Sequence, residues 1–330
     1  MNDCTVLVVG GAGYIGTHMV NELLKAKINV ISLDNLSTGY RDLLPGGLFI
    51  EGRLGDATLL DKIFSTHHID AVMHFAAYSL VGESVAKPLK YYRNNLAETT
   101  ELLDAMRRHN VKRFIFSSTA AVYGEPAEVP ISEDHPCAPT NPYGATKLAV
   151  ERMLADCDTA HNFKFIALRY FNAAGADESG KLGERHEPET HLIPCILKAA
   201  AGELENVQIF GTRYPTPDGT CLRDYVHVSD LAQAHLLALE ALLSGKDSRI
   251  YNLGNSNGHS VRQVIEVARK VTGHQILAVE SAPRPGDPAV LVADSAKIRK
   301  ELGWQPKFED LDRMIQSAWD WHRFDKKEEL

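Results

Sequence analysis

The sequence predicts an α/β protein with a doubly wound parallel sheet and a smaller C-terminal α/β domain. Through the first half of the chain, short β-branched apolar runs alternate with segments whose apolar residues recur at helical spacing. A glycine-rich turn, GGAGYIG, joins the first apolar run to the first helical segment. After residue 172 the alternation stops, and a stretch rich in Gly, Pro and charge follows.

Six buried strands are expected in the first half, each a short apolar run. They cover residues 4–10, 28–35, 48–52, 71–77, 113–118 and 164–172. Helical segments cover residues 14–27, 87–109 and 142–158, and Pro142 suits the first turn of the last one. Strands that alternate with helices form right-handed crossovers. The sheet should therefore be parallel, of Rossmann type, with ligands at the carboxyl ends of its strands.

The second half is less regular. After a loop, the pattern predicts a helix, a strand, a second loop and another apolar run, at residues 192–201, 207–210, 211–220 and 221–228. Two further helices should begin after Ser260 and Ser295, which are both suitable N-cap residues. We divide the chain into a main domain of residues 1–175 and a smaller domain of residues 176–330, with some elements exchanged between them.

Composition excludes several classes of protein. The 330 residues are 44% hydrophobic and 24% charged, which is typical of a globular protein, and the net charge is −8 with no basic block. Nucleic acid and anionic membranes are therefore not expected partners. Five scattered cysteines without a CxxC pair indicate reduced thiols, and no apolar run is long enough for a membrane span. We expect a cytoplasmic protein.

The glycine turn predicts a dinucleotide site. Gly10, Gly13 and Gly16 follow a strand and open a helix, where the backbone can approach a pyrophosphate and the helix N-terminus offers N–H groups. Asp34 ends the second strand, and a carboxylate there would bond ribose hydroxyls and repel a 2′-phosphate, which favours NAD over NADP. The alternatives are a glycine turn without a ligand and a solvated aspartate.

Tyr143 and Lys147 are four residues apart on a predicted helix and so share one face. A phenol is a poor base at neutral pH, but a nearby ammonium favours the phenolate. Thr119, in the upstream SSTAAVYG stretch, is a candidate hydrogen-bond partner. A Tyr-x-x-x-Lys pair alone arises by chance in many helices. Together with the glycine turn and the Ser/Thr stretch it predicts a proton-transfer site.

These motifs resemble those of the extended short-chain dehydrogenase/reductases, and among them the UDP-glucose 4-epimerase (UDP-galactose 4-epimerase) family. The similarity runs through GGAGYIG, DN, HFAA, VGESV, SST, VYG, NPYGATK, LRYFNAAGA, HLIP, RDYVHVSDLA, YNLGN and RPGDPA. The resemblance implies an NAD-binding Rossmann domain over residues 1–175 and a UDP-sugar-binding domain over residues 176–330. It also implies a homodimer, formed by the helices that begin near Pro88 and Tyr143.

The resemblance assigns roles residue by residue. Tyr143, Lys147 and Thr119 would be catalytic. The cofactor set is Gly10, Gly13, Tyr14, Ile15, Gly16, Asp34, Asn35, Leu54, Phe75, Ala76, Ala77, Asn95, Ser117, Tyr143, Lys147 and Tyr170. The set for the nucleotide sugar is Ser79, Thr119, Tyr143, Asn172, His191, Leu192, Gln208, Phe210, Arg223, Tyr225, Arg284, Asp287 and Leu291. Arginine forks suit diphosphate oxygens, although a single arginine is more often a surface ion-pair partner.

Several positions depart from the family pattern. Arg53 stands where the family has the Asp that reads the adenine amino group, and Asp56 is a candidate substitute. Ser79 replaces a Lys of some members, and Leu291 replaces a Tyr or Cys at the sugar pocket. HEPETH is not a helical HExxH zinc motif, because its histidines are five apart with Pro188 between them, so we expect no metal site.

Ala120-Ala121 narrows the predicted reaction. Related 4,6-dehydratases have Asp-Glu after the Thr as a general acid and base for elimination, whereas this pair carries no proton. The sequence therefore predicts oxidation and re-reduction at C4 of UDP-glucose and UDP-galactose. Activity on UDP-N-acetylglucosamine and UDP-N-acetylgalactosamine is a further hypothesis. The remaining alternatives are a UDP-glucuronate 4-epimerase, another NAD-dependent nucleotide-sugar dehydrogenase or dehydratase, and a non-catalytic NAD-binding protein.

Overall fold

The computed structural model describes residues 4–284 and 286–328, which fold as two compact units, each made of several chain segments. Unit 1 comprises Met1–Gly124, Pro136–Arg169 and Ala232–Tyr251, and unit 2 comprises Glu125–His135, Tyr170–Leu231 and Asn252–Leu330. The chain therefore passes between the units more than once. Pro285, within the RPGDPA motif, lies outside the described residues.

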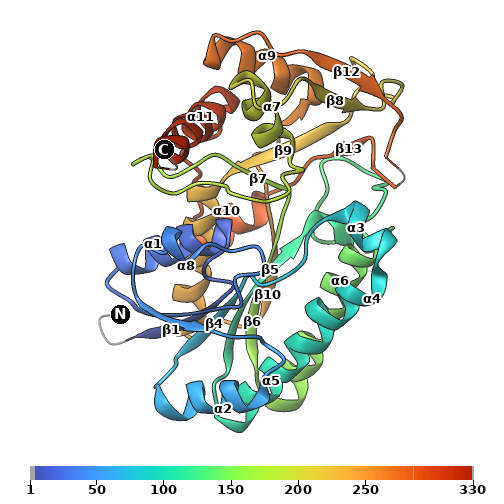
Figure 1. The fold of residues 1–330 in the computed structure, drawn as a ribbon. Helices are drawn as coiled ribbons and strands as arrows, with labels where there is room; N and C mark the ends of the chain where they lie inside the picture. The colour runs from blue at the N-terminus through green and yellow to red at the C-terminus, as the bar shows by residue number, and fades with distance from the viewer. Residues whose placement is uncertain (1–3, 285, 329–330) are drawn as a thin grey trace. The chain divides into compact units, whose positions relative to one another are not determined.

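A seven-stranded sheet is the centre of unit 1 in the part of the chain that the structure describes, and its order is β10-β6-β5-β4-β1-β2-β3 (Figure 1). The strands are β1 Thr5–Val9, β2 Asn29–Asp34, β3 Leu48–Glu51, β4 Ala71–His74, β5 Arg113–Thr119, β6 Lys164–Tyr170 and β10 Arg249–Leu253. The pairings among β1 to β5 are parallel. The Rossmann-type sheet and its six predicted strands are confirmed, and β10 is an addition at the edge.

The helices of unit 1 cover the sheet. They are α1 Tyr14–Lys25, α2 Ala57–Thr66, α3 Val81–Ala86, α4 Pro88–Tyr91, α5 Glu98–Arg108, α6 Pro142–His161 and most of α8 Val228–Leu243. The helix predicted over 87–109 forms, but its turns over Tyr92–Ala97 are π-helical. Short 3₁₀ turns occur at Arg41–Leu43 and Ala120–Val122. Helices α2, α5 and α6 are gathered on one side of the strands and α1 with α8 on the other (Figure 1).

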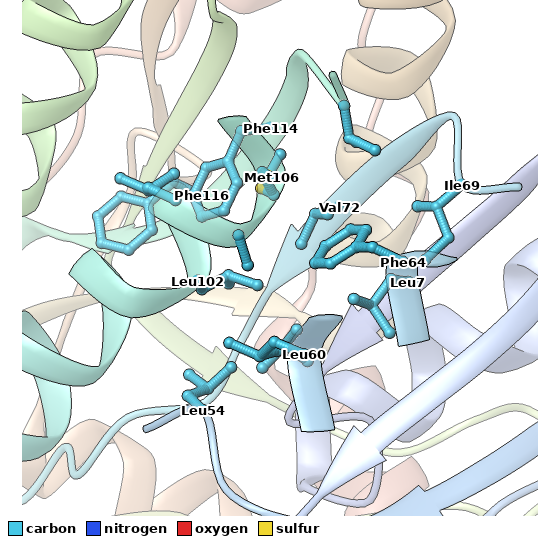
Figure 2. Packing of buried hydrophobic residues seen from close by; sticks show 14 of the residues in the cluster. Leu7, Leu54, Leu60, Phe64, Ile69, Val72, Leu102, Met106, Phe114 and Phe116 are labelled. Carbon is cyan, nitrogen blue, oxygen red and sulfur yellow. The ribbon is translucent and has the colours of Figure 1, made fainter. Parts of the chain in front are cut away.

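The main core of unit 1 lies between the sheet and helices α2, α5 and α6. Strand residues such as Leu7, Val72 and Phe114 pack in one cluster with Leu60 of α2 and Leu102 of α5 (Figure 2). Burying one such side chain stabilises the fold by roughly 1.5–3 kcal/mol. This packing fixes the strands whose carboxyl ends carry the predicted cofactor residues.

Unit 2 contains two small sheets. In the first, β9 Leu222–His227 lies between β11 Gly258–Ser260 and β13 Val290–Leu291, and β7 Asn172–Ala174 also pairs with β9. In the second, β8 Val207–Phe210 pairs in parallel with β12 Ala278–Ser281. The helices are α7 Leu192–Ala200, α9 Val261–Thr272, α10 Ala296–Leu302 and α11 Leu311–Glu328. The apolar faces of α7, α9 and α11, with those of β8 and β9, form a second core.

The two serines expected to cap helices behave differently. Ser260 caps α9 in a capping box with Gln263, as predicted. Ser295 is the N-cap residue of α10, as predicted, but its side chain makes no capping hydrogen bond, because its hydroxyl exchanges hydrogen bonds with the backbone of Gly254. Among residues 4–284 and 286–328, no helix is both long enough and apolar enough to cross a bilayer.

Candidate active site

The glycine turn wraps tightly around the end of β1. Gly10 has a φ of +78°, and a Cβ there would come within 2.5 Å of the Ala76 nitrogen. A Cβ on Gly16 would lie 2.1 Å from the Gly10 carbonyl oxygen. Helix α1 begins after Gly13, which has no side chain to cap it, and its first turn, Tyr14 and Ile15 included, holds no acidic residue. The positive end of α1 is therefore suited to an anion.

Asp34 is held against this turn. Its carboxylate accepts hydrogen bonds from the backbone N–H groups of Ala12, at 2.9 Å, and Leu36, at 2.8 Å. Burial raises the pKa of Asp34, and these hydrogen bonds oppose the rise. The next residue, Asn35, accepts from the Ser37 N–H. The turn and the carboxylate thus form one rigid arrangement at the carboxyl ends of β1 and β2.

Thr119, Tyr143 and Lys147 come together where β5 meets α6. The Lys147 ammonium is 3% exposed and donates a 2.7 Å hydrogen bond to the Ser117 carbonyl oxygen. Burial lowers the pKa of Lys147 to about 7, against the opposing effect of the Glu151 carboxylate. Burial also raises the pKa of Tyr143, whereas its hydrogen bond with Thr119 lowers it. Thr119 and Lys147 are buried and Tyr143 is half-buried, and the three predicted catalytic residues form one group.

A buried ion pair supports this group, and the sequence analysis missed it. Glu151 lies one helical turn beyond Lys147 and forms a two-point pair with Arg169 at 2.9 and 2.5 Å. Its carboxylate also accepts from the Ser118 hydroxyl, and Arg169 donates to the Tyr123 hydroxyl. The side chains of Arg169 and Glu151 are 5% and 3% exposed. The available signal was the spacing, because Tyr143, Lys147 and Glu151 recur every four residues.

The other predicted cofactor residues vary in their placement. Phe75, Ala76 and Ala77 follow β4, directly beside the glycine turn, and Leu54 is buried after β3. Asn95 is also buried, and its amide bonds both the N–H and the carbonyl of Tyr78. Asn95 therefore anchors the segment that carries the exposed Ser79. Tyr170 ends β6, at the point where the chain passes from unit 1 into unit 2.

Arg53, which stands where the family has the Asp that reads adenine, forms an ion pair within unit 1. Its guanidinium pairs with Glu98 at 2.5 Å on the surface. The proposed substitute, Asp56, is the N-cap of α2 and accepts from the Leu59 N–H at 3.0 Å. Both side chains therefore have local structural roles.

In unit 2, four predicted substrate residues lie on neighbouring strands. On β7 and β9, Asn172 is opposite Tyr225, and on β13 and β9, Leu291 is opposite Arg223. The Arg223 guanidinium forms a close ion pair with Asp287. The register therefore joins two motifs, RDYVHV and RPGDPA, that are far apart in the sequence.

A second group of substrate candidates surrounds β8. The Arg284 guanidinium stacks over the Phe210 ring at 4.0 Å from its centroid. Gln208, two residues earlier, accepts a hydrogen bond from the Ser281 hydroxyl of β12 at 3.1 Å. An aromatic ring beside a guanidinium offers a stacking surface and a positive charge, which together suit a nucleotide.

His191 and Leu192 begin α7, where Leu192 packs against the core of unit 2. His191 belongs to a group of four side chains that we call the histidine–carboxylate cluster: Glu184, His186, Glu189 and His191. Burial alone would lower the pKa of His191, but the Glu184 and Glu189 carboxylates raise it to about 10. The two histidines of HEPETH thus come together because the chain forms a loop there, although they cannot share a helix face.

The chain is similar to known proteins over nearly its whole length. Residues 6–254 match the model of the NAD dependent epimerase/dehydratase family. A UDP-glucose 4-epimerase of Halalkalibacterium halodurans is 54% identical, over 96% of this chain and 95% of that protein. A crystal structure of a UDP-glucose 4-epimerase superposes with a TM-score of 0.95 at 48% identity, over 98% of each chain. The Bifidobacterium longum UDP-glucose 4-epimerase, solved with NAD+ and UDP, gives 0.94 at 43% identity, over 98% of this chain and 99% of that one.

Proposed function

Because the chain belongs to the NAD-dependent epimerase/dehydratase family, we propose that it is a UDP-glucose 4-epimerase, which interconverts UDP-glucose and UDP-galactose. The observation that carries this proposal is the group of Tyr143, Lys147 and Thr119, in which Thr119 is followed directly by Ala120-Ala121. The Tyr143 group can transfer the one proton that oxidation at C4 requires. The two alanines offer no second acid or base, so the elimination of water lacks its proton carriers.

The cofactor is NAD, and unit 1 fits it. The glycine turn and the N-terminus of α1 suit the pyrophosphate, because the turn is so tight that a Cβ on Gly10 or Gly16 would collide with backbone, and because the first turn of α1 offers N–H groups. Asp34 would accept from the adenosine ribose hydroxyls, and Lys147 would hold the other ribose. Bound NAD supplies a reversible two-electron oxidant for C4 of the sugar.

The chain's own residues handle the proton. The Tyr143 phenol oxygen takes the proton of the sugar 4-hydroxyl and later returns it. A charged Lys147 favours the phenolate, and its bond to the Ser117 carbonyl fixes the ammonium in place. The Thr119 hydroxyl, which already bonds Tyr143, orients the sugar 4-oxygen. Buried Glu151 and Arg169 brace the strand and helix that carry these groups.

Unit 2 provides the residues for the nucleotide. We assign the diphosphate to Arg223 and Arg284, the base to Gln208 and Phe210, and a ribose hydroxyl to Asp287. Guanidinium groups bind phosphate oxygens in two-point geometry, and a carboxylate accepts from hydroxyls. Strong anchoring of the diphosphate leaves the sugar free to present either face, which a 4-epimerase requires.

The proposal is tested by approaching equilibrium from both sides. Purified protein is incubated with UDP-galactose or with UDP-glucose, and the products are separated by chromatography. Both reactions should reach one common ratio without accumulating NADH. Accumulating NADH or a 4-keto-6-deoxy product would instead indicate a dehydrogenase or a dehydratase. Conversion of UDP-glucuronate alone would indicate the uronate epimerase, and bound NAD without turnover of any UDP-sugar would indicate a binding protein.

Leu291 favours a second pair of substrates, UDP-N-acetylglucosamine and UDP-N-acetylgalactosamine. It lies opposite Arg223, and it is smaller than the Tyr of some relatives. A Tyr ring at this position would crowd the N-acetyl group of the sugar, and such overpacking costs roughly 1–3 kcal/mol. Leu291→Tyr should abolish acetylhexosamine turnover and leave UDP-galactose turnover within a few-fold. Wild-type protein without acetylhexosamine turnover at high enzyme concentration would show a strict hexose epimerase.

We further propose that the enzyme is a cytoplasmic homodimer. A row of apolar side chains on α3, α4 and the following turn is exposed, from Val81 and Val85 (57%) to Leu89 (67%) and Tyr92. Such a row is suited to a second copy of the chain. Light scattering should give twice the monomer mass for the wild-type protein and the monomer mass for Leu89→Asp. The five free thiols suit a reducing compartment.

A further inference from the structure

We propose that the histidine–carboxylate cluster binds one divalent transition-metal ion, with Zn²⁺ as the best fit. The four ligand atoms that its side chains offer all lie within 4.8 Å of one another. Two imidazoles and two carboxylates are the nitrogen and oxygen ligands that Zn²⁺ takes in proteins, whereas Mg²⁺ and Ca²⁺ prefer oxygen alone. None of its four side chains is among the residues proposed to handle the proton or the cofactor.

The distances suit tetrahedral coordination. Zn²⁺ with ligands at about 2.0–2.2 Å places neighbouring ligand atoms roughly 3.4 Å apart. His191 Nδ1 lies 2.8 Å from Glu184 Oε1 and 3.1 Å from Glu189 Oε1. His186 Nδ1 lies 3.2 Å from Glu184 Oε1 and 3.6 Å from Glu189 Oε2. An ion at the centre of the cluster therefore requires only small shifts of side chains.

His186 supplies an independent indication. Its Nδ1 atom is shielded from solvent and has no well-directed hydrogen bond, although two carboxylates lie nearby. A buried polar atom without a hydrogen bond is destabilising unless another partner is present. A metal ion would provide that partner, and the two carboxylates would balance its charge.

The framework around the cluster is already fixed. The Glu184 carbonyl accepts from the Trp321 indole N–H at 3.1 Å, and neighbouring Arg185 pairs with Asp325 of α11. Glu189 Oε1 accepts the N–H groups of Thr190 and His191, so this carboxylate is held at the start of α7. A bound ion would thus clasp the loop over residues 184–191 to α7.

The test is direct metal binding by the full-length protein. Protein stripped with a chelator is titrated with Co²⁺, whose four-coordinate complexes absorb strongly in the visible range, and Zn²⁺ is then added as a competitor. Wild-type protein should take up one Co²⁺ per chain and release it to one Zn²⁺. His186→Asn and Glu184→Gln should each weaken binding by more than about 100-fold, the upper range for outer-shell changes. His274→Asn, an exposed histidine of unit 2, should bind as wild type.

Circular dichroism establishes that each variant is folded. If a variant does not fold, proteolysis of the wild-type loop over residues 184–191 replaces it, and Zn²⁺ should slow cleavage at least several-fold. Absence of stoichiometric Co²⁺ uptake would overturn the proposal. So would equal Co²⁺ affinity in wild type and His186→Asn, or a cleavage rate that Zn²⁺ leaves unchanged.

Discussion

In unit 1 the Lys147 ammonium is buried against a backbone carbonyl, whereas in unit 2 the Arg223 guanidinium is paired with a carboxylate, Asp287. Burial lowers the pKa of Lys147 to about 7, so a small change in its surroundings alters its charge at neutral pH. The Arg223 guanidinium is already paired, and an incoming anion must compete with Asp287 for it. One unit is thus arranged for proton transfer and the other for exchange of ion partners.

The largest expected effect concerns the proton-transfer group of unit 1. Tyr143→Phe should fold and retain NAD but lose about two to four decades of kcat, the range for general acid–base catalysis. Thr119→Ser keeps the hydroxyl and is the matched control, with nearly wild-type turnover. Steady-state kinetics and the NAD content of the purified variants measure both. Near wild-type turnover of Tyr143→Phe would remove this residue from the base role.

A large effect on stability is expected from the buried pair beneath that group. Arg169→Met leaves the Glu151 carboxylate buried without its partner, which should lower the free energy of unfolding by about 3–5 kcal/mol. Adding Glu151→Leu removes the orphaned charge and should recover much of the loss. Urea denaturation of the single and double variants measures this. A single-variant loss under about 1 kcal/mol would mean that water or another group solvates Glu151.

A smaller effect is expected in unit 2. Arg223→Ala removes a charge-assisted contact with the diphosphate, worth about 1.5–3 kcal/mol, so KM should rise about 10- to 100-fold. The kcat value should change less, because this contact holds substrate and transition state alike. Arg262→Ala, which breaks an exposed pair with Glu280, is the control and should leave KM unchanged. If Arg223→Ala lowers kcat and leaves KM unchanged, Arg223 does not serve mainly to bind the diphosphate, and the contrast between proton transfer in unit 1 and anion binding in unit 2 is wrong.

The smallest effect is expected at Arg53. Its pair with Glu98 is exposed on the arginine side, and such pairs contribute about 0–1 kcal/mol. Arg53→Ala should therefore change the free energy of unfolding by less than about 1 kcal/mol and leave NAD retention unchanged. Isothermal titration calorimetry of NAD into the apoprotein measures the NAD affinity. A several-fold change in NAD affinity would show that Arg53 contacts the cofactor.

Much of the fold was predictable because unit 1 follows the alternation of strands and helices closely. Strand β10 was missed, since its sequence, RIYNL, is only five residues long and includes two polar residues. The π-helical turns over Tyr92–Ala97 were missed as well, because spacing alone does not distinguish them from α-helix. The Ser295 side chain makes no capping hydrogen bond because a tertiary partner, Gly254, takes its hydroxyl.

Of the candidate site, the residue types were predictable and their partners were not. Tyr143 and Lys147 followed from spacing, yet the bond from Lys147 to the Ser117 carbonyl depends on how β5 meets α6. The pair between Arg223 and Asp287 joins residues 64 positions apart. The histidine–carboxylate cluster is formed by a loop, and a rule based on helical periodicity had no means of anticipating it.

The interleaving of the two units has a consequence for biosynthesis. Unit 1 includes Ala232–Tyr251, which supplies part of α8 and most of the edge strand β10. A ribosome that has finished Arg169 must still make Tyr170–Leu231, all of which belongs to unit 2, before this segment begins. At about 5–20 residues per second, the sheet waits several seconds with the β6 edge unpaired. During that interval the nascent chain exposes a β edge, and chaperone capture there would favour correct closure over association with another chain.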